Sequence, residues 1–283
     1  MRELVHPAVL TLVKGVVALV VVLIAGNYFW DKYVQGAYYA YENPYCNIAV
    51  VPIEGGISTI PDELYFPVAA DRVLADLRAA ELDPYTEGIL VRIDSPGGTL
   101  VASELITDAV RRTTKPTIAL IREIGTSGGY LVATGADAII ASPNSSVGSI
   151  GVTSSYIETA GQLESEGGKF IELVSAPYKE AGNPDRPLSE PERELFVRDL
   201  TMMHESFVSQ VARNRSLPIE EVRKIADGSS VLGVKALELG LIDMLGDQET
   251  ARSWFSTQLN TLSDFCEPPP PLPATPSYEE ASL

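Results

Sequence analysis

The feature that most limits the fold is an alternation of apolar runs with helical patterns between residues 47 and 262. Four apolar runs rich in β-branched residues have the length of strands: NIAVVPI (47–53), GILVRI (88–93), TIALI (117–121) and AIIA (138–141). Helical patterns follow three of them, at 69–82, 100–112 and 128–136. Strands without polar alternation are buried on both faces, and strands separated by helices pair in parallel. The sequence therefore predicts an α/β fold with a parallel sheet covered by helices on both faces.

The second half of this region is mainly helical by its pattern. A long helix is expected at about 190–214, where Ser189 and Glu192 form a capping box and apolar residues recur with a helical period. Two shorter helices are expected at 218–226 and 233–239, and each is followed within two residues by a glycine, as helix ends commonly are.

The chain is strongly acidic, which limits the partners that it can bind. Its 283 residues hold 21 Lys and Arg against 38 Asp and Glu, a formal net charge of −17. This balance lacks the basic surface that nucleic-acid binding requires. With two cysteines and two histidines in the chain, neither a His or Cys metal site nor a cofactor is expected.

An apolar segment at residues 7–30 predicts a membrane anchor. Lys14 is its one charged residue, and the aromatic residues 28–30 lie at its end. A helix of this length rises about 36 Å, enough to cross a hydrocarbon core of about 30 Å. A cleaved signal peptide is the alternative, but no small-x-small site precedes the aromatic cluster, which favours an uncleaved anchor. Arg2 and Lys14 precede the apolar core and Lys32 follows it, and this charge bias predicts a cytoplasmic N-terminus at residues 1–6.

The remaining chain divides by composition. Residues 31–46 form a Tyr-rich stalk, residues 47–262 form the globular domain, and residues 263–283 form a Pro-rich flexible tail. With the anchor in place, we expect a single-pass protein of the cell membrane whose globular domain is extracytoplasmic.

Two glycine-containing turns between strands and helices are candidates for chemistry. The first is DSPGG (94–98), where two glycines allow backbone N–H groups to approach a ligand, such as a phosphate or an oxyanion. An ordinary tight turn explains this turn equally well. The second is GTSGGY (125–130), which places Ser127 at the start of a helix, either as an N-cap or as a nucleophile. A third turn is SSVGSIGV (145–152), and its pattern alone predicts only a loop followed by a strand.

The residues alone do not identify the base that would activate Ser127. Gly125-x-Ser127-x-Gly129 matches the nucleophile elbow of α/β-hydrolases, which needs a histidine. His204 is the only histidine after the N-terminal apolar segment. It falls inside the long predicted helix, so an ordinary helix residue is favoured over a catalytic base at this position. A lysine is the other type of base, and Lys179 lies in a loop without periodicity. No Ser-x-x-Lys occurs, so the penicillin-binding type of site is excluded.

Taken together, the motifs resemble peptidase family S49 in its short, single-repeat form, from about residue 48 to 246. The motifs that carry the resemblance occur in the expected order: RIDSPGG (92–98), SGGY within GTSGGY (125–130), VGSIGV (147–152), YKEAGNPDRPLSEPERE (178–194) and IADGSSVLGVKALELGLIDMLG (225–246). Two positions depart from the family pattern: Gly-Thr precedes Ser127 where Ala-Ala is common, and Asp94 stands where Asn is common.

The resemblance implies a ClpP/crotonase-like spiral fold and a serine endopeptidase that degrades signal peptides and other unfolded peptides. By motif, Ser127 is the nucleophile and Lys179 the general base of a Ser–Lys dyad. Ser149 would orient Lys179 by a hydrogen bond, and the N–H groups of Gly97 and Gly98 would form the oxyanion hole.

The resemblance also implies a homo-oligomeric ring in which neighbouring protomers share active sites, Ser127 of one copy meeting Lys179 of the next. Two alternatives remain. One is a catalytically weak scaffold of the same fold that binds peptides or membrane proteins. The other is a crotonase-type acyl-CoA enzyme, which leaves the anchor and the SGGY motif unexplained. As a further hypothesis, Cys46 and Cys266, which flank the globular domain, form a disulfide.

Overall fold

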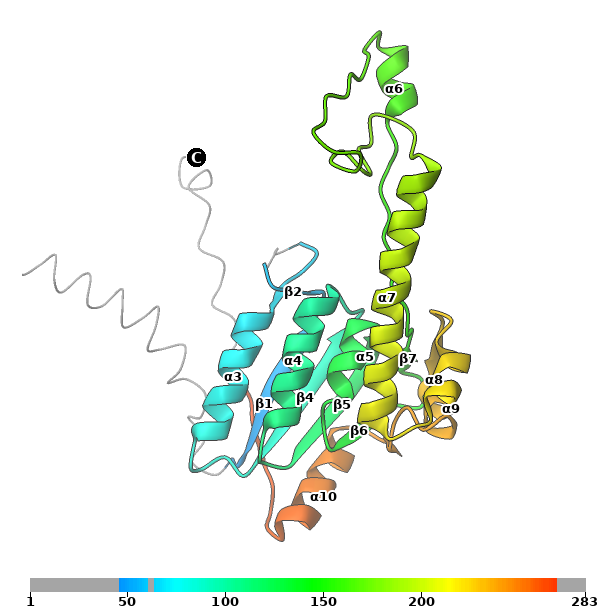
Figure 1. Cartoon of the computed structure of the whole chain (residues 1–283). Coiled ribbons are helices and arrows are strands. Elements are labelled where there is room, and N and C mark those ends of the chain that lie inside the picture. The colour runs from blue at the N-terminus through cyan, green and yellow to red at the C-terminus, as the bar shows by residue number, and fades with distance from the viewer. Residues whose placement is uncertain (1–45, 61–63, 269–283) are drawn as a thin grey trace, which may run out of the picture.

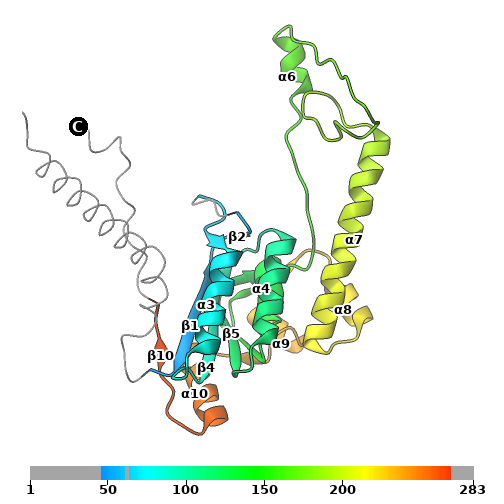
Figure 2. The same cartoon turned by 60° about the vertical axis from the view of Figure 1, so that its left-hand side comes forward.

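The computed structural model describes residues 46–60 and 64–268 (Figures 1 and 2). An eight-stranded sheet forms its centre, and two further short strands form a separate two-stranded sheet. The strands are β1 Ile48–Glu54, β2 Ile57–Ser58, β3 Val68–Ala69, β4 Gly88–Ser95, β5 Thr117–Thr126, β6 Ala138–Ala141, β7 Ser146–Gly148, β8 Ser230–Leu232, β9 Met244–Leu245 and β10 Phe265–Cys266. The helices that the structure describes are α3 Ala70–Leu82, α4 Leu100–Arg112, α5 Gly128–Ala133, α6 Ala160–Ser165, α7 Glu190–Arg215, α8 Ile219–Ile225, α9 Gly233–Glu238 and α10 Gln248–Leu259.

The sheet has the order β10-β1-β4-β5-β6-β9, with β7 attached to β5 and β8 attached to β7. Every described pair is parallel except β7 with β8. The predicted α/β fold with a parallel sheet is therefore confirmed. The third glycine-containing turn holds a short strand, β7, within it rather than after it.

Both faces of the sheet are buried, as the unbroken apolar runs predict. Along β1, Ala49, Val51 and Ile53 face one core cluster together with α3, α4 and α5, whereas Ile48 and Val50 face a second cluster. The second face is covered by α10 through Ala251 and Phe255. This alternation of side chains follows from the two-residue period of a strand. The sequence patterns did not predict α10, although Asp247 caps its first turn by accepting the N–H groups of Glu249 and Thr250.

A long projection leaves the body after β7 and returns through α7 (Figures 1 and 2). We call residues 153–203 the arm, which includes α6 and the outer part of α7. Glu192 is the one buried residue of the arm in the described structure. The inner part of α7 instead packs on the body through Phe207, Val208 and Val211. The long helix and its capping box are confirmed, but its outer half has no core of its own.

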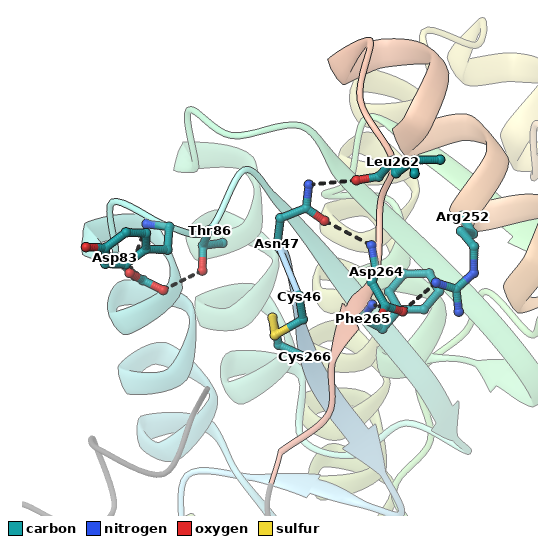
Figure 3. Close-up of a disulfide and its surroundings, with 10 residues drawn as sticks. Cys46, Asn47, Asp83, Thr86, Arg252, Leu262, Asp264, Phe265 and Cys266 are labelled. Carbon is teal, nitrogen blue, oxygen red and sulfur yellow. Dashed lines mark hydrogen bonds and ion pairs between the residues drawn. A yellow bond between two sulfur atoms is a disulfide. The ribbon is translucent and has the colours of Figure 1, made fainter. Parts of the chain in front are cut away.

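The two flanks of the domain meet at the edge of the sheet (Figure 3). Cys46 and Cys266 form a disulfide with their Cα atoms 5.2 Å apart, which confirms the pairing hypothesis. The amide of Asn47 supports this junction, because its Nδ2 donates to the Leu262 carbonyl at 3.2 Å and its Oδ1 accepts the Asp264 N–H at 2.9 Å. The folded sheet thus continues to Cys266 through β10.

The predicted anchor at 7–30, the stalk before Cys46 and the tail from residue 269 lie outside the described residues. Within residues 46–60 and 64–268, no helix combines the length and the apolar character needed to cross a membrane.

Candidate active site

Two turns lie against each other where β4 and β5 end. A Cβ atom added at Gly97 would lie 2.6 Å from the Gly128 nitrogen and 2.9 Å from the Ser127 Cβ. A Cβ atom at Gly129 would likewise lie 2.7 Å from the Ser95 carbonyl oxygen. Glycine is therefore required on both sides of this contact, and it brings the DSPGG turn against Ser127.

Ser127 has the backbone of a strained turn. Its φ is 50° and its ψ is −124°, a region that residues with a side chain seldom adopt. Its N–H donates to the Gly148 carbonyl at 2.7 Å, which fixes the turn against β7. The hydroxyl stands at the N-cap position of α5 but makes no capping hydrogen bond. The N-cap interpretation of Ser127 therefore fails, and its hydroxyl is left for another role.

A cleft of about 620 Å³ opens beside Ser127. Its apolar lining includes Pro96 in the first turn and Val197 and Leu200 on α7. Its polar lining includes Ser149 and Asp227. The volume falls in the range of ligand-binding clefts.

The first turn offers a backbone donor beside Ser127. The Gly97 N–H donates to the Ser95 hydroxyl at 3.1 Å, so it is engaged within its own turn. The Gly98 N–H donates no hydrogen bond to any described residue, and its nitrogen lies 3.2 Å from the position of a Cβ atom at Gly128. The Gly128 N–H, directly after Ser127, is also without an acceptor in the described chain. Gly128 was not among the predicted site residues, although its place next to Ser127 in the sequence is a signal for it.

Asp94, one of the two departures from the family pattern, has a structural partner. Its Oδ1 accepts the Ile124 N–H at 3.2 Å, and its carbonyl accepts the Gly55 N–H at 2.9 Å. The register between β4 and β5 shifts between Ile93 and Ser95, next to this contact. The Asp94 carboxylate therefore bridges the two strands where their regular pairing is interrupted.

Ser149 and Asp227 are two of the polar residues that line the cleft. Ser149 also has a positive φ, 53°, and its hydroxyl donates to the Gly228 carbonyl at 2.8 Å. The Asp227 carboxylate accepts the side-chain and backbone donors of Ser229 at 2.6 and 2.9 Å. These hydrogen bonds hold the pKa of Asp227 below its usual range, and the one from the Ser229 hydroxyl has the larger effect. Asp227 is therefore a fixed negative charge at the cleft.

The two candidate bases lie in different places. Lys179 is exposed in the arm, where its N–H donates to the Ala176 carbonyl at 3.1 Å, and it does not line the cleft of its own chain. His204 on α7 does line the cleft together with Ser127. Within one chain the structure therefore brings together Ser127, Ser149 and the DSPGG turn, but not Lys179. The helical spacing of Val197, Leu200 and His204 is the sequence signal that places them on one face.

Across residues 46–60 and 64–268, no three His, Cys, Asp or Glu side chains are grouped so that they could hold a metal ion.

The parallel-sheet fold and the half-buried Ser127 beside a cleft fit a protease, and the comparisons with known proteins support that class. The family model described as peptidase family S49 matches residues 109–262, which include Ser127, Ser149 and Lys179. The chain belongs to peptidase family S49.

Curated relatives carry names of the same class. The chain is 36% identical over 203 residues to the "Putative protease slr0021" of Synechocystis, covering 68% of this chain and 73% of that protein. It is 32% identical over 212 residues to "Serine protease SPPA, chloroplastic" of Arabidopsis thaliana, covering 70% of this chain and 30% of that protein. It is 30% identical over 181 residues to the "Putative signal peptide peptidase SppA" of Enterococcus faecium, covering 63% of this chain and 53% of that protein.

Proposed function

We propose that this protein is a membrane-anchored serine endopeptidase in which Ser127 is the nucleophile. The observation that carries the proposal is the Ser127 turn. The turn holds a serine at positive φ, with a hydroxyl that caps nothing, in a cleft beside two unused backbone N–H groups. A strained turn that exposes a serine hydroxyl is a recurring device for nucleophiles.

The chemistry follows from these positions. The Ser127 Oγ attacks the peptide carbonyl carbon while the general base removes the hydroxyl proton. The carbonyl oxygen becomes an oxyanion that the N–H groups of Gly98 and Gly128 can receive, with Gly97 setting the shape of the turn. Collapse of this intermediate breaks the C–N bond, and the base returns the proton to the leaving amine. Water then attacks the ester carbonyl carbon while the base removes a proton from the water. The C–Oγ bond breaks, the base returns the proton to the Ser127 Oγ, and the carboxylic acid product leaves.

Lys179 of a neighbouring copy is the proposed base. It is exposed in a loop of the arm and lies outside the cleft of its own chain, so a second protomer would bring a lysine to Ser127. The arm also exposes large apolar side chains suited to contact with another copy: Ile157, Ile171, Leu173, Val197 and Met202. In that assembly, a homo-oligomeric ring, Ser149 would exchange its bond to the Gly228 carbonyl for one that orients Lys179.

His204 is the second candidate for the base. The specific observation in its favour is that it lines the same cleft as Ser127 within one chain. The two candidates are separable, because a shared site requires assembly whereas a Ser–His pair does not. Loss of turnover in Lys179→Ala with retention in His204→Gln supports the shared site, and the opposite pattern supports the single-chain site.

The substrates proposed are signal peptides and other unfolded peptides. The apolar lining residues Pro96, Val197 and Leu200 suit the apolar side chains of such peptides. The anchor at 7–30 would hold the domain outside the cytoplasm, where peptides released from the membrane are close at hand. The disulfide between Cys46 and Cys266 supports this location, because such bonds persist in oxidising compartments.

The decisive experiment compares three full-length proteins in detergent or vesicles: the parent, Ser127→Ala and Ser253→Ala. Ser253 is exposed on α10, on the other face of the sheet, and serves as the matched control. We expect the parent and the control to cleave an unstructured protein and to react with a fluorophosphonate. Ser127→Ala should do neither. Equal cleavage by all three would reject Ser127 as the nucleophile, and cleavage by none would favour the scaffold alternative.

Mixing tests the shared site directly. Inactive Ser127→Ala and Lys179→Ala proteins, allowed to exchange subunits, should recover part of the parent turnover, since some interfaces pair an intact serine with an intact lysine. Confirmed exchange without recovery contradicts the shared site.

A further inference from the structure

Arg186 occupies the centre of a polar cluster in the arm. Its Nη2 and Nη1 donate to the two carboxylate oxygens of Glu192 at 2.6 and 2.9 Å. Its Nε lies 3.1 Å from a carboxylate oxygen of Glu172. Its Nη2 also donates to the backbone carbonyl of Glu180 at 3.0 Å. One guanidinium therefore joins three segments of the arm.

The contact with Glu180 links this cluster to the proposed base, because Glu180 is the residue after Lys179. The other hydrogen bonds that the structure describes for the short loop around them lie within the loop. The backbone N–H groups of Lys179, Ala181 and Asn183 each donate to the carbonyl three residues earlier, and the Asn183 side-chain amide donates to the Glu180 carboxylate at 2.9 Å. Little apolar packing holds this loop, since no residue between 153 and 190 is buried. Its position therefore depends on polar contacts.

The other end of the cluster is anchored in α7. The Glu192 side chain is 4% exposed, and its Oε2 accepts the Ser189 N–H at 2.9 Å and the Ser189 hydroxyl at 2.6 Å. The hydrogen bonds from Arg186 and Ser189 lower the pKa of Glu192 to about 2, so the carboxylate stays charged at neutral pH. Arg186 thus connects the Lys179 loop to the first turn of a long helix.

We propose that Arg186 is a positioning residue for the general base, because its guanidinium fixes the backbone that carries Lys179. The inference rests on the proposed function, in which Lys179 acts on Ser127 of a neighbouring copy. A guanidinium suits this task because its planar donors reach a carboxylate and a carbonyl at once. A lysine at the same position can keep an ion pair with Glu192, but one ammonium on a flexible stem does not hold both partners in fixed geometry.

The test uses full-length Arg186→Lys and Arg186→Gln, with Arg193→Gln as the matched control. Arg193 is an exposed residue in the first part of α7, seven residues after Arg186, and it has no ion pair among the described residues. The readouts are kcat, KM, the pH dependence of kcat and the oligomeric state by light scattering. Ser127→Ala and Lys179→Ala are measured beside them.

We expect Arg186→Gln to lower kcat by about 10- to 100-fold, because a small misplacement of a catalytic group has effects of that size. KM and the oligomeric state should stay close to those of the parent. The acid limb of the pH–kcat profile, which reports deprotonation of the base, should move to higher pH. Arg186→Lys should fall between the parent and Arg186→Gln, and Arg193→Gln should match the parent.

Parent values of kcat and of the acid limb in Arg186→Gln would overturn the inference, while a dead Lys179→Ala would leave the proposed function intact. A kcat loss accompanied by loss of assembly would also overturn it in favour of a purely structural role. If Arg186→Gln does not fold, Arg186→Lys decides: parent kinetics reject positioning, and lowered kcat with retained assembly supports it. If Ser127→Ala or Lys179→Ala stays active, the proposed function and this inference fail together.

Discussion

The body and the arm are held together by different forces. The body has a sheet buried on both faces by apolar side chains, whereas Glu192, the one buried residue of the arm, is charged. The proposed nucleophile lies in the body and the proposed base lies in the arm. This division means that the serine is rigidly placed by the fold, while the lysine is placed by polar contacts and by whatever the arm meets. Four experiments test this difference between the body and the arm.

The largest difference is expected from core truncation. Phe255 is fully buried on α10 and packs edge-on against Phe265 at a ring separation of 6.4 Å. Phe255→Ala should lower the free energy of unfolding by about 3–5 kcal/mol. Leu173→Ala is the arm counterpart, and this side chain is 93% exposed. Its unfolding free energy should match that of the parent in urea titrations of detergent-solubilised protein, and a loss comparable to that of Phe255→Ala would show that the arm has a core.

Reduction of the disulfide should also act on the body. Opening the Cys46–Cys266 bond removes a link across 220 residues and should destabilise the body by about 2–5 kcal/mol. Hydrogen exchange measured with and without reductant should show faster exchange in β1 and β10 and unchanged exchange in the arm. A Cys46→Ser, Cys266→Ser protein, insensitive to reductant, is the control. Equal protection of β10 in both states would contradict the expected role of the bond.

Two glycines with positive φ differ in whether there is room for a side chain, so alanine at each position distinguishes a steric clash from the cost of the backbone conformation. A Cβ atom at Gly97, with φ of 102°, would meet Gly128 and Ser127, whereas one at Gly167 in the arm, with φ of 77°, meets nothing within 4 Å. Each alanine should cost about 1–2 kcal/mol for its backbone conformation. Gly97→Ala should in addition lower turnover by about 100-fold or more, because it displaces the DSPGG turn, which carries the proposed oxyanion donor Gly98. Turnover of Gly167→Ala equal to that of Gly97→Ala would contradict the packing argument.

The smallest effect is a pH dependence of the arm. The folded pKa of Glu192, about 2, is depressed from 4.5, so its contribution to arm stability is complete above about pH 4.5 and is lost as the pH falls toward 2. Hydrogen exchange in residues 170–195 should therefore accelerate over this range relative to its intrinsic rate. In Glu192→Gln this extra acceleration should be absent. An unchanged profile in that variant would assign the effect to another group.

The sequence predicted those parts of the molecule whose structure is determined locally. The apolar runs of β1, β4, β5 and β6 gave the sheet because burial on both faces leaves an unmistakable pattern. By contrast, β10 was read as part of the tail, because a two-residue strand carries no period and its place depends on the distant Cys46. The turn around Ser127 was found from its glycines, which two touching backbones require.

The arrangement of the bases could not be predicted in the same way. Residues 153–189 have no periodic pattern, and their projection away from the body depends on where α7 begins and how far it extends. The place of His204 at the cleft depends on how α7 lies beside the segments at 149–153 and 226–228, which line the same cleft. These are tertiary relations between segments far apart in the chain, so a local pattern does not contain them.

The junction of Cys46 with Cys266 makes the domain a closed covalent loop. A single cut at any peptide bond inside that loop, including one in the exposed arm, opens the circle without separating the two pieces. A protease of this construction that nicked its own arm would keep both fragments on one tether, and only reduction would let them part. Electrophoresis without reductant would therefore not resolve the fragments of a nicked chain.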